Sequence, residues 1–339
     1  MTRRDELLGA GRKAAEVLSA IDARRIVDDG YTRIDPFSIA GDEGVPVIVR
    51  PLERLLGAFL REDQPGILIN AERPAGLVHM TCAHELGHYF LGHRTTFDER
   101  IDYGDAASLQ ERQADWFAYM LLTPRWLLAK LMRIKDLSAA SLGDAAVIYQ
   151  LSLRLGVSYT GTVWSARRQN LIRVDQAEAL ARVKPRDIKR SLAGIDLGDT
   201  GNQDVWLLDA RDRNLLLEPR HNDKFVVDLP SHASAGYLWS LDEVTREGFH
   251  LRPMLVNGEH EQTPEGGTRI GGTSSLRYRL DRTEAKPIDA ARFSFRESQP
   301  WRAGDMAATS FDLSAHFESI THGLTPQTRQ RLVEEVRSE

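Results

Sequence analysis

Residues 82–93 hold the side chains whose types and spacing best fit metal chemistry, in the order Cys-Ala-His-Glu-Leu-Gly-His-Tyr-Phe-Leu-Gly-His. His84 and His88 are four residues apart, so on a helix both imidazoles leave the same face one turn apart. Two neutral imidazoles so placed can bind one metal ion, and Zn²⁺ is the usual occupant. Glu85 can then take a proton from metal-bound water without binding the metal itself. The alternative is a helix that contains this pattern by chance, so the assignment requires a third ligand elsewhere.

Two acidic residues further along the chain can supply that ligand. Glu111 and Asp115 are four residues apart in an apolar-striped stretch that Pro124 ends, which places both carboxylates on one face of a predicted helix. We predict that Glu111 is the third ligand of a single zinc ion. Asp115 is expected to accept the outward N–H of a ligating histidine and so to fix its tautomer. The alternative is that both acids are simply solvated.

Other side chains near the motif are interpreted differently. His93 is five residues after His88, which turns a helix by roughly 140° and takes the side chain off the metal face. We predict that His93 is a terminal or solvated histidine. Cys82 is predicted to be a small buried residue, with an inhibitory or redox zinc ligand as the alternative, because thiolates bind zinc well. Tyr89 and Tyr103 are guesses for a group that stabilises the oxyanion.

Composition limits the classes of protein to be considered. The chain has 339 residues, of which 42% are apolar and 27% charged, which is ordinary for a soluble protein and sufficient for two domains. A net charge of −5 excludes a uniformly basic nucleic-acid coat. A single cysteine excludes an intrachain disulfide framework. The N-terminal residues lack an apolar signal segment, and the apolar run over 116–122 is too short to span a bilayer. We therefore expect a cytoplasmic protein with no membrane association.

Several predicted elements must position the motif. Apolar spacing predicts an amphipathic helix over residues 5–28, and Asp35 followed by Pro36 predicts the start of a short helix. Strands are predicted over 45–49, 57–60 and 66–70, and the motif helix over 77–91. The strand over 66–70 precedes that helix, so we predict that it binds an extended substrate by main-chain hydrogen bonds, through Ile67, Leu68, Ile69 and Asn70. The alternative is a plain sheet strand.

The order of these motifs resembles the ImmA/IrrE family of metallopeptidases over roughly residues 30–175. The resemblance rests on Ile34-Asp35-Pro36, on the runs over 66–70 and 80–88, and on the runs over 111–118 and 121–124. It implies a small α+β, zincin-like domain in which His84, His88 and Glu111 hold one zinc ion and Glu85 is catalytic. It further implies cleavage of a helix-turn-helix repressor of the XRE type, which derepresses a stress, phage-defence or mobile-element operon.

A basic, helical segment follows Pro124 and is predicted to extend to about residue 193. Residues 151–172 have the cadence of a helix-turn-helix, and residues 167–190 hold eight basic and three acidic side chains. We predict a DNA contact here, with single-stranded DNA as an activator after DNA damage. The alternatives are a solvated basic face, or a DNA-binding regulator whose metal site is structural. The candidate residues are Arg167, Arg168, Arg173, Lys184, Arg186, Lys189 and Arg190.

The second half of the chain changes to a period of two. A polar, glycine-rich stretch predicts a linker over 196–204, which separates a peptidase domain over 1–195 from an all-β sandwich over 205–318. A C-terminal helix is predicted within 319–339. Strands are predicted over 205–208, 215–217, 224–229, 275–280, 292–296 and 310–317.

The β-rich half resembles the chagasin family of cysteine-peptidase inhibitors over about residues 212–318. The resemblance rests on the run over 228–239, on Gly271-Gly272-Thr273 and on Gln299-Pro300-Trp301. It implies an immunoglobulin-like sandwich whose loops enter a papain-like cleft. The run over 231–235 and Gln299 depart from the family pattern at those loops. We therefore expect an accessory domain for substrate docking, sensing or restraint of the zinc site, with a peptidase-inhibitor module as the alternative.

Overall fold

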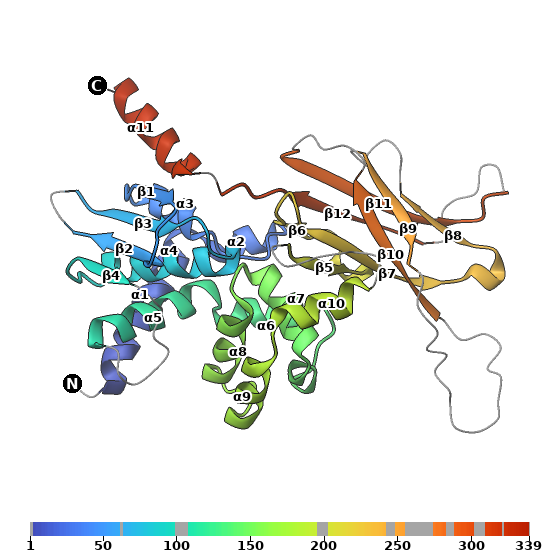
Figure 1. Ribbon diagram of the computed structural model, residues 1–339, viewed down its shortest axis with the longest axis horizontal. Helices are drawn as coiled ribbons and strands as arrows, with labels where there is room; N and C mark the ends of the chain where they lie inside the picture. Colours follow the sequence, from blue (N-terminus) through green and yellow to red (C-terminus); the bar gives the residue numbers. More distant parts are fainter. Residues whose placement is uncertain are drawn as a thin grey trace. The chain divides into compact units, whose positions relative to one another are not determined.

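The computed structural model divides the chain into two units, one of residues 1–182 and 319–339 and one of residues 183–318 (Figure 1). It describes residues 3–61, 64–98, 108–194, 203–241, 248–254, 274–282, 288–301, 309–320 and 322–338. Each unit is considered by itself. Within the described residues, every helix is too short or too polar to cross a membrane.

The first unit contains a mixed sheet in the strand order β13-β1-β3-β2-β4. Its strands are β1 (Val47–Arg50), β2 (Gly57–Leu60), β3 (Gly66–Asn70), β4 (Thr96–Asp98) and β13 (Gly323–Leu324). The predicted strands over 57–60 and 66–70 are confirmed to the residue, whereas the strand expected at 45–49 begins two residues later. The sequence did not reveal β4 and β13, because each is too short to show a period of its own.

The position of β3 in this sheet overturns one prediction. β3 pairs with β1 in a parallel arrangement and with β2 in an antiparallel one. In the two pairings, Ile67 lies opposite Val47 and Phe59, respectively. Its main chain is therefore paired on both sides and cannot take up an extended substrate. Asn70 is also occupied, since its side-chain amide donates to the carbonyls of Leu52 and Leu55, both at 2.8 Å. The substrate-binding role predicted for Ile67, Leu68, Ile69 and Asn70 is wrong.

Helices pack on the sheet of the first unit. The predicted helix over 5–28 is divided into α1 (Arg3–Ala20) and α2 (Ala23–Asp28), because Asp22 adopts a left-handed conformation with φ of 49°. α3 (Pro36–Asp42) begins as predicted, with the Asp35 carboxylate accepting from the Phe37 amide at 2.9 Å. The motif lies on α4 (Ala75–Phe90), and α5 (Leu109–Leu122) carries the predicted acidic pair. The helical segment that follows comprises α6 (Arg125–Ile134), α7 (Ala145–Leu155), α8 (Tyr159–Arg168) and α9 (Val174–Arg182).

The C-terminal segment returns to this same unit. β13 pairs with β1, and the Thr325 amide donates to the Val47 carbonyl at 3.1 Å. α11 (Pro326–Ser338) packs on α3, where Arg331 donates to the carbonyls of Gly41 and Asp42 at 2.7 and 2.9 Å. The first unit is thus built from two pieces of chain that are far apart in the sequence.

A buried hydroxyl of α11 forms a hydrogen bond with β1, and its removal is predicted to lower the stability of the first unit. The Thr328 hydroxyl accepts from the Val47 amide at 3.1 Å. Thr328→Val keeps the shape but leaves that buried N–H without its acceptor, so we expect the free energy of unfolding to fall by about 1–3 kcal/mol. Urea denaturation measures the change. Val333→Thr at an exposed position of α11 is the matched control and should alter stability by less than about 0.5 kcal/mol. Equal effects of both variants would contradict the assignment.

The second unit is a two-layer β-sandwich. One sheet has the order β5-β7-β10-β9 and the other the order β6-β12-β11-β8. Phe225 and Phe249 of the first sheet contact Phe293 of the second, with ring centroids 6.3 and 4.9 Å apart, so the core lies between the sheets. The strands are β5 (Val205–Leu208), β6 (Leu216–Leu217), β7 (Lys224–Ser231), β8 (Leu238–Leu241), β9 (Phe249–Pro253), β10 (Ser274–Arg282), β11 (Ala290–Ser298) and β12 (Thr309–His316).

The predicted boundary region differs in detail from the units found. Of the expected linker over 196–204, residues 196–202 lie outside the described residues. α10 (Pro185–Ala193), which the sequence placed with the peptidase domain, groups with the second unit. It buries Ile188 and Leu192, and Lys189 forms an ion pair with Asp204 at 3.0 Å just before β5.

Candidate metal centre

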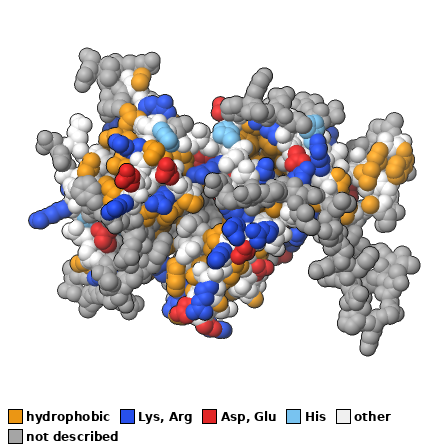
Figure 2. Space-filling model, viewed as in Figure 1, with side chains coloured by type: hydrophobic (Ala, Val, Ile, Leu, Met, Phe, Trp, Pro, Cys, Tyr) orange, Lys and Arg blue, Asp and Glu red, His pale blue; other side chains and the backbone are white. Residues whose placement is uncertain are grey.

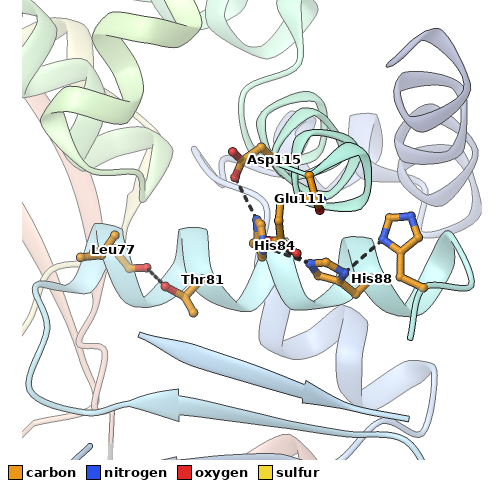
Figure 3. A network of polar contacts seen from close by, with 8 residues as sticks. Leu77, Thr81, His84, His88, Glu111 and Asp115 are labelled. Carbon is orange, nitrogen blue, oxygen red and sulfur yellow. Dashed lines mark hydrogen bonds and ion pairs between the residues drawn. The ribbon is translucent and has the colours of Figure 1, made fainter. Parts of the chain in front are cut away.

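The centre forms where α4 and α5 approach each other closely. A Cβ atom on Gly87 would lie 3.0 Å from the Ala114 Cα atom and 3.1 Å from the Ala114 carbonyl oxygen. A side chain at position 87 would therefore force the helices apart. The Gly87–Ala114 contact brings the histidine face of α4 to the acidic face of α5 (Figure 3).

Three ligand atoms converge at this crossing. The distance between His84 Nε2 and His88 Nε2 is 3.0 Å, and Glu111 Oε2 lies 3.2 Å from the first and 3.6 Å from the second. Ligands about 2.0–2.2 Å from a tetrahedral zinc ion are separated by roughly 3.3 Å. The three predicted ligands therefore have the spacing that one zinc ion requires. Among the described residues this is the one cluster of histidine, cysteine and acidic side chains that could hold a metal.

Asp115 sets the tautomer of the first histidine. Its Oδ1 atom lies 2.9 Å from His84 Nδ1, and both side chains are buried. A proton on Nδ1 donates to this carboxylate, so Nε2 of the neutral imidazole keeps its lone pair for a cation. Asp115 lies where the sequence predicted it, one turn after Glu111 on α5 (Figure 3).

The surroundings of Glu111 favour the ionised form of its carboxyl group, which is the form that binds a cation. Burial opposes its ionisation, but hydrogen bonds with His84 and His88 outweigh burial and hold the pKa of the carboxyl well below its usual range. With its carboxyl ionised, Glu111 can join one nitrogen of each imidazole in a set of one carboxylate and two histidines, a donor set typical of a catalytic zinc site.

Glu85 is fully buried beside the sheet. A Cβ atom on Gly57 of β2 would lie 2.7 Å from Glu85 Oε1 and 2.5 Å from Thr81 Cγ2. The carboxylate of Glu85 thus occupies space that only a glycine on the strand leaves open. Sequence reasoning placed Glu85 correctly on the helix but did not detect the role of Gly57.

His93 lies just past the end of α4 and outside the cluster of three ligand atoms, as predicted, but it is buried and not solvated. α4 ends at Phe90, Gly92 adopts a φ of +72°, and the His93 amide donates to the His88 carbonyl at 3.0 Å. This glycine turn folds His93 back, with its Nδ1 atom 3.1 Å from Nδ1 of His88. Burial, followed by the neighbouring His88, lowers the pKa of His93 to about 4. The burial of His93 was missed because the helical geometry was extrapolated beyond the end of α4. The Leu-Gly-His sequence was the available signal, since its glycine permits a turn.

Of the remaining candidates near the motif, Cys82 is not part of the cluster of three ligand atoms. Cys82 is buried as predicted, and burial, with lesser contributions from Asp35 and Glu85, raises the pKa of its thiol. The Tyr89 hydroxyl donates to Glu43 at 3.4 Å. Tyr103 lies outside the described residues.

The helix-turn-helix cadence corresponds to α7 and α8, joined at Gly156 with a φ of +65°. α8 buries most of its length, and Ser165 Oγ lies 2.5 Å from Thr123 Oγ1. A recognition helix must instead present its side chains to a DNA groove. The buried face of α8 therefore favours a packing role for this helix pair.

The predicted basic residues are divided between the units and are partly engaged within the protein. The Arg168 guanidinium lies 4.0 Å from the centre of the Tyr119 ring, and Arg173 pairs with Asp175 at 2.7 Å. Figure 2 shows Lys and Arg interspersed with Asp and Glu on the visible face. Arg167, Arg168 and Arg173 belong to the first unit, and Lys184, Arg186, Lys189 and Arg190 belong to the second. The DNA contact stays a prediction.

Comparison with solved structures shows low-scoring similarities. A cysteine protease inhibitor from Entamoeba histolytica, EhICP2, is 17% identical, with 34% of this chain and 97% of that chain covered and a TM-score of 0.27. Amebosin is 16% identical, with 34% and 98% covered and a TM-score of 0.25. No curated protein matches the chain.

Comparison with protein families gives a match for the region that contains the centre. Residues 40–160 match the model of the IrrE N-terminal-like domain, Peptidase_M78. This region begins in α3, ends at the start of α8 and contains the histidine pair, Glu85 and both acids of α5. Residues 40–160 thus form an IrrE N-terminal-like domain of the Peptidase_M78 family of metallopeptidases.

Proposed function

We propose that this protein is a cytoplasmic, zinc-dependent endopeptidase that cleaves a helix-turn-helix repressor of the XRE type. Cleavage would derepress a stress, phage-defence or mobile-element operon. The observation that carries the peptidase assignment is the convergence of His84 Nε2, His88 Nε2 and Glu111 Oε2 within a domain that matches a peptidase family. The choice of a repressor as substrate is supported by the resemblance to the ImmA/IrrE family.

In the proposed reaction, Glu85 and Asp115 have different roles. Bound zinc would supply a Lewis acid that activates water and polarises the scissile carbonyl. Glu85 accepts the proton of the attacking water and delivers it to the leaving amine. Asp115 holds the His84 imidazole with Nε2 directed at the centre.

Substrate binding is assigned to β4 in place of β3. β4 stands at the edge of the sheet in its described part and pairs with β2 through Gly57 opposite Asp98. β2 is also the strand that lies against Glu85. An extended substrate segment could pair with the outer edge of β4 through main-chain hydrogen bonds. It would then be separated from β2, the strand that contacts Glu85, by β4 alone.

The function is tested with the repressor encoded beside the gene. Purified, zinc-loaded protein is incubated with this repressor, with and without single-stranded DNA, and the products are identified by mass spectrometry. We expect one discrete cut, and a faster reaction with DNA if DNA is the activator. A repressor that stays intact under every condition would refute the proposed substrate.

DNA activation has its own measurement. Titration of labelled single-stranded DNA across a salt series should give a steep loss of affinity with salt, because phosphate contacts release counterions. Replacement of the exposed pair Lys184 and Arg186 by Gln should lower that slope. An unchanged slope would remove these two residues from the proposed contact.

The space that Gly57 leaves for Glu85 gives a further prediction. Gly57→Ala places a methyl group against the Glu85 carboxylate and Thr81. We expect kcat for repressor cleavage to fall by on the order of 10–100-fold, because a small displacement of a catalytic group is costly, while zinc affinity is retained. Gly66→Ala on β3 is the matched control, since its Cβ would meet no atom closer than 3.8 Å. Equal losses in both variants would count against this role of Gly57.

A further inference from the structure

We infer that His93 and Gln113 form a positioning relay for the metal ligand His88. His93 lies with Nδ1 3.1 Å from His88 Nδ1 and with Nε2 3.2 Å from Gln113 Oε1. His88 and His93 are both buried. The inference rests on the proposed zinc site, and it assigns to these two residues the orientation of one of the ligands.

The direction of each hydrogen bond follows from the ligand atom. His88 directs Nε2 at His84 Nε2 and at Glu111, so a neutral His88 that binds a cation through Nε2 carries its proton on Nδ1. That proton is donated to Nδ1 of His93. Neutral His93 then carries its own proton on Nε2 and donates it to the Gln113 carbonyl oxygen. Only this arrangement gives every ring nitrogen a complementary partner.

The two histidine ligands therefore have different supports from the same helix. α5 provides Asp115, whose carboxylate accepts directly from His84, and Gln113, whose neutral amide acts on His88 through His93. An anionic hydrogen-bond acceptor raises the basicity of a ligating imidazole more than a neutral acceptor does. We expect His84 to be the stronger and His88 the weaker of the two ligands.

The backbone fixes the middle member of the relay. The Gly92 turn and the bond from the His93 amide to the His88 carbonyl hold His93 against the end of α4. His93 thus has a defined place behind His88, on the side opposite to the atom that faces Glu111.

The test measures zinc affinity of the full chain by competition with a chromophoric chelator. Partners of this kind are worth about 10–100-fold in metal affinity, so we expect His93→Leu to weaken zinc binding within that range. His93→Gln restores an acceptor and a donor and should recover part of the loss. His79→Leu is the matched control, because His79 is a buried histidine of α4 that bonds to the Gly156 carbonyl instead. His79→Leu should leave zinc affinity unchanged.

A double-mutant cycle separates a relay from independent packing effects. Gln113→Leu should weaken zinc binding in the wild-type background and have no further effect in the His93→Leu background, because Gln113 acts through His93. Additive effects, or unchanged zinc affinity in His93→Leu, would overturn the inference. The absorption spectrum of the Co²⁺-loaded protein gives a second readout and should shift in His93→Leu but not in His79→Leu. If the wild-type protein binds no zinc, the proposed function itself fails; if it binds zinc and cleaves, only the relay is at stake.

Discussion

Glu85→Gln is expected to leave zinc bound and to lower kcat for repressor cleavage by about 10²–10⁴-fold, the usual contribution of general acid–base catalysis. The amide has nearly the same shape as the carboxylate, so the fully buried pocket beside Gly57 should accept it. An amide cannot accept the proton of the attacking water. Glu85 is also outside the cluster of three ligand atoms, so zinc affinity should stay within a factor of a few of the wild-type value.

Two measurements on the same preparation decide the role of Glu85. Zinc affinity is obtained by chelator competition, and kcat from the rate of repressor cleavage at saturation. The exposed Glu53→Gln is the control and should match the wild type in both. Cleavage by Glu85→Gln at the wild-type rate would refute the mechanism. Loss of zinc would show that Glu85 supports the centre in place of acting on the proton.

Gly87→Val is expected to disrupt the centre without changing any residue that binds zinc. Added atoms at position 87 meet the backbone of α5 at Ala114, and overpacking of this kind typically costs about 1–3 kcal/mol. The helices must separate, which takes Glu111 and Asp115 away from the histidine pair. We expect zinc affinity to fall by at least about 10-fold, because that distance sets the spacing of the ligands.

The matched control for Gly87 lies on α1. Gly9 is also a helical glycine, and a Cβ atom there meets nothing within 4 Å. Gly9→Val therefore introduces the same side chain without the close contact, and zinc affinity should be unchanged. Isothermal titration of both variants with Zn²⁺, together with thermal unfolding, provides the comparison. An unaltered zinc affinity in Gly87→Val would show that the helix crossing is not what sets the ligand spacing.

Local patterns predicted most of the elements because each such pattern is complete within a few residues. The cap at Asp35, the spacing of His84 and His88 and the end of α5 before Pro124 all depend on neighbours in the chain. β4, β8, β9 and β13 were not predicted, since their formation depends on partner strands distant in the sequence. The break at Asp22 was missed because the apolar spacing continues across it.

In the candidate site, too, local features were predicted and features that depend on distant contacts were missed. Helical spacing predicted which residues share a face, and the structure brings His84, His88, Glu111 and Asp115 together. The mistaken substrate-binding role of β3 reflects sheet order, which no single strand encodes. His93 and Gln113 were missed because their contact depends on a turn at Gly92 and on the approach of two helices.

The return of the C-terminal segment to the first unit has a consequence for synthesis. β13 and α11 are encoded after the whole β-sandwich, yet β13 completes one edge of the sheet that supports the peptidase domain. A nascent chain emerging from the ribosome therefore lacks this edge until the second unit has been translated. Full assembly of the domain around the candidate metal ligands is thereby delayed until translation has passed residue 324, and a prematurely terminated chain would lack that strand permanently.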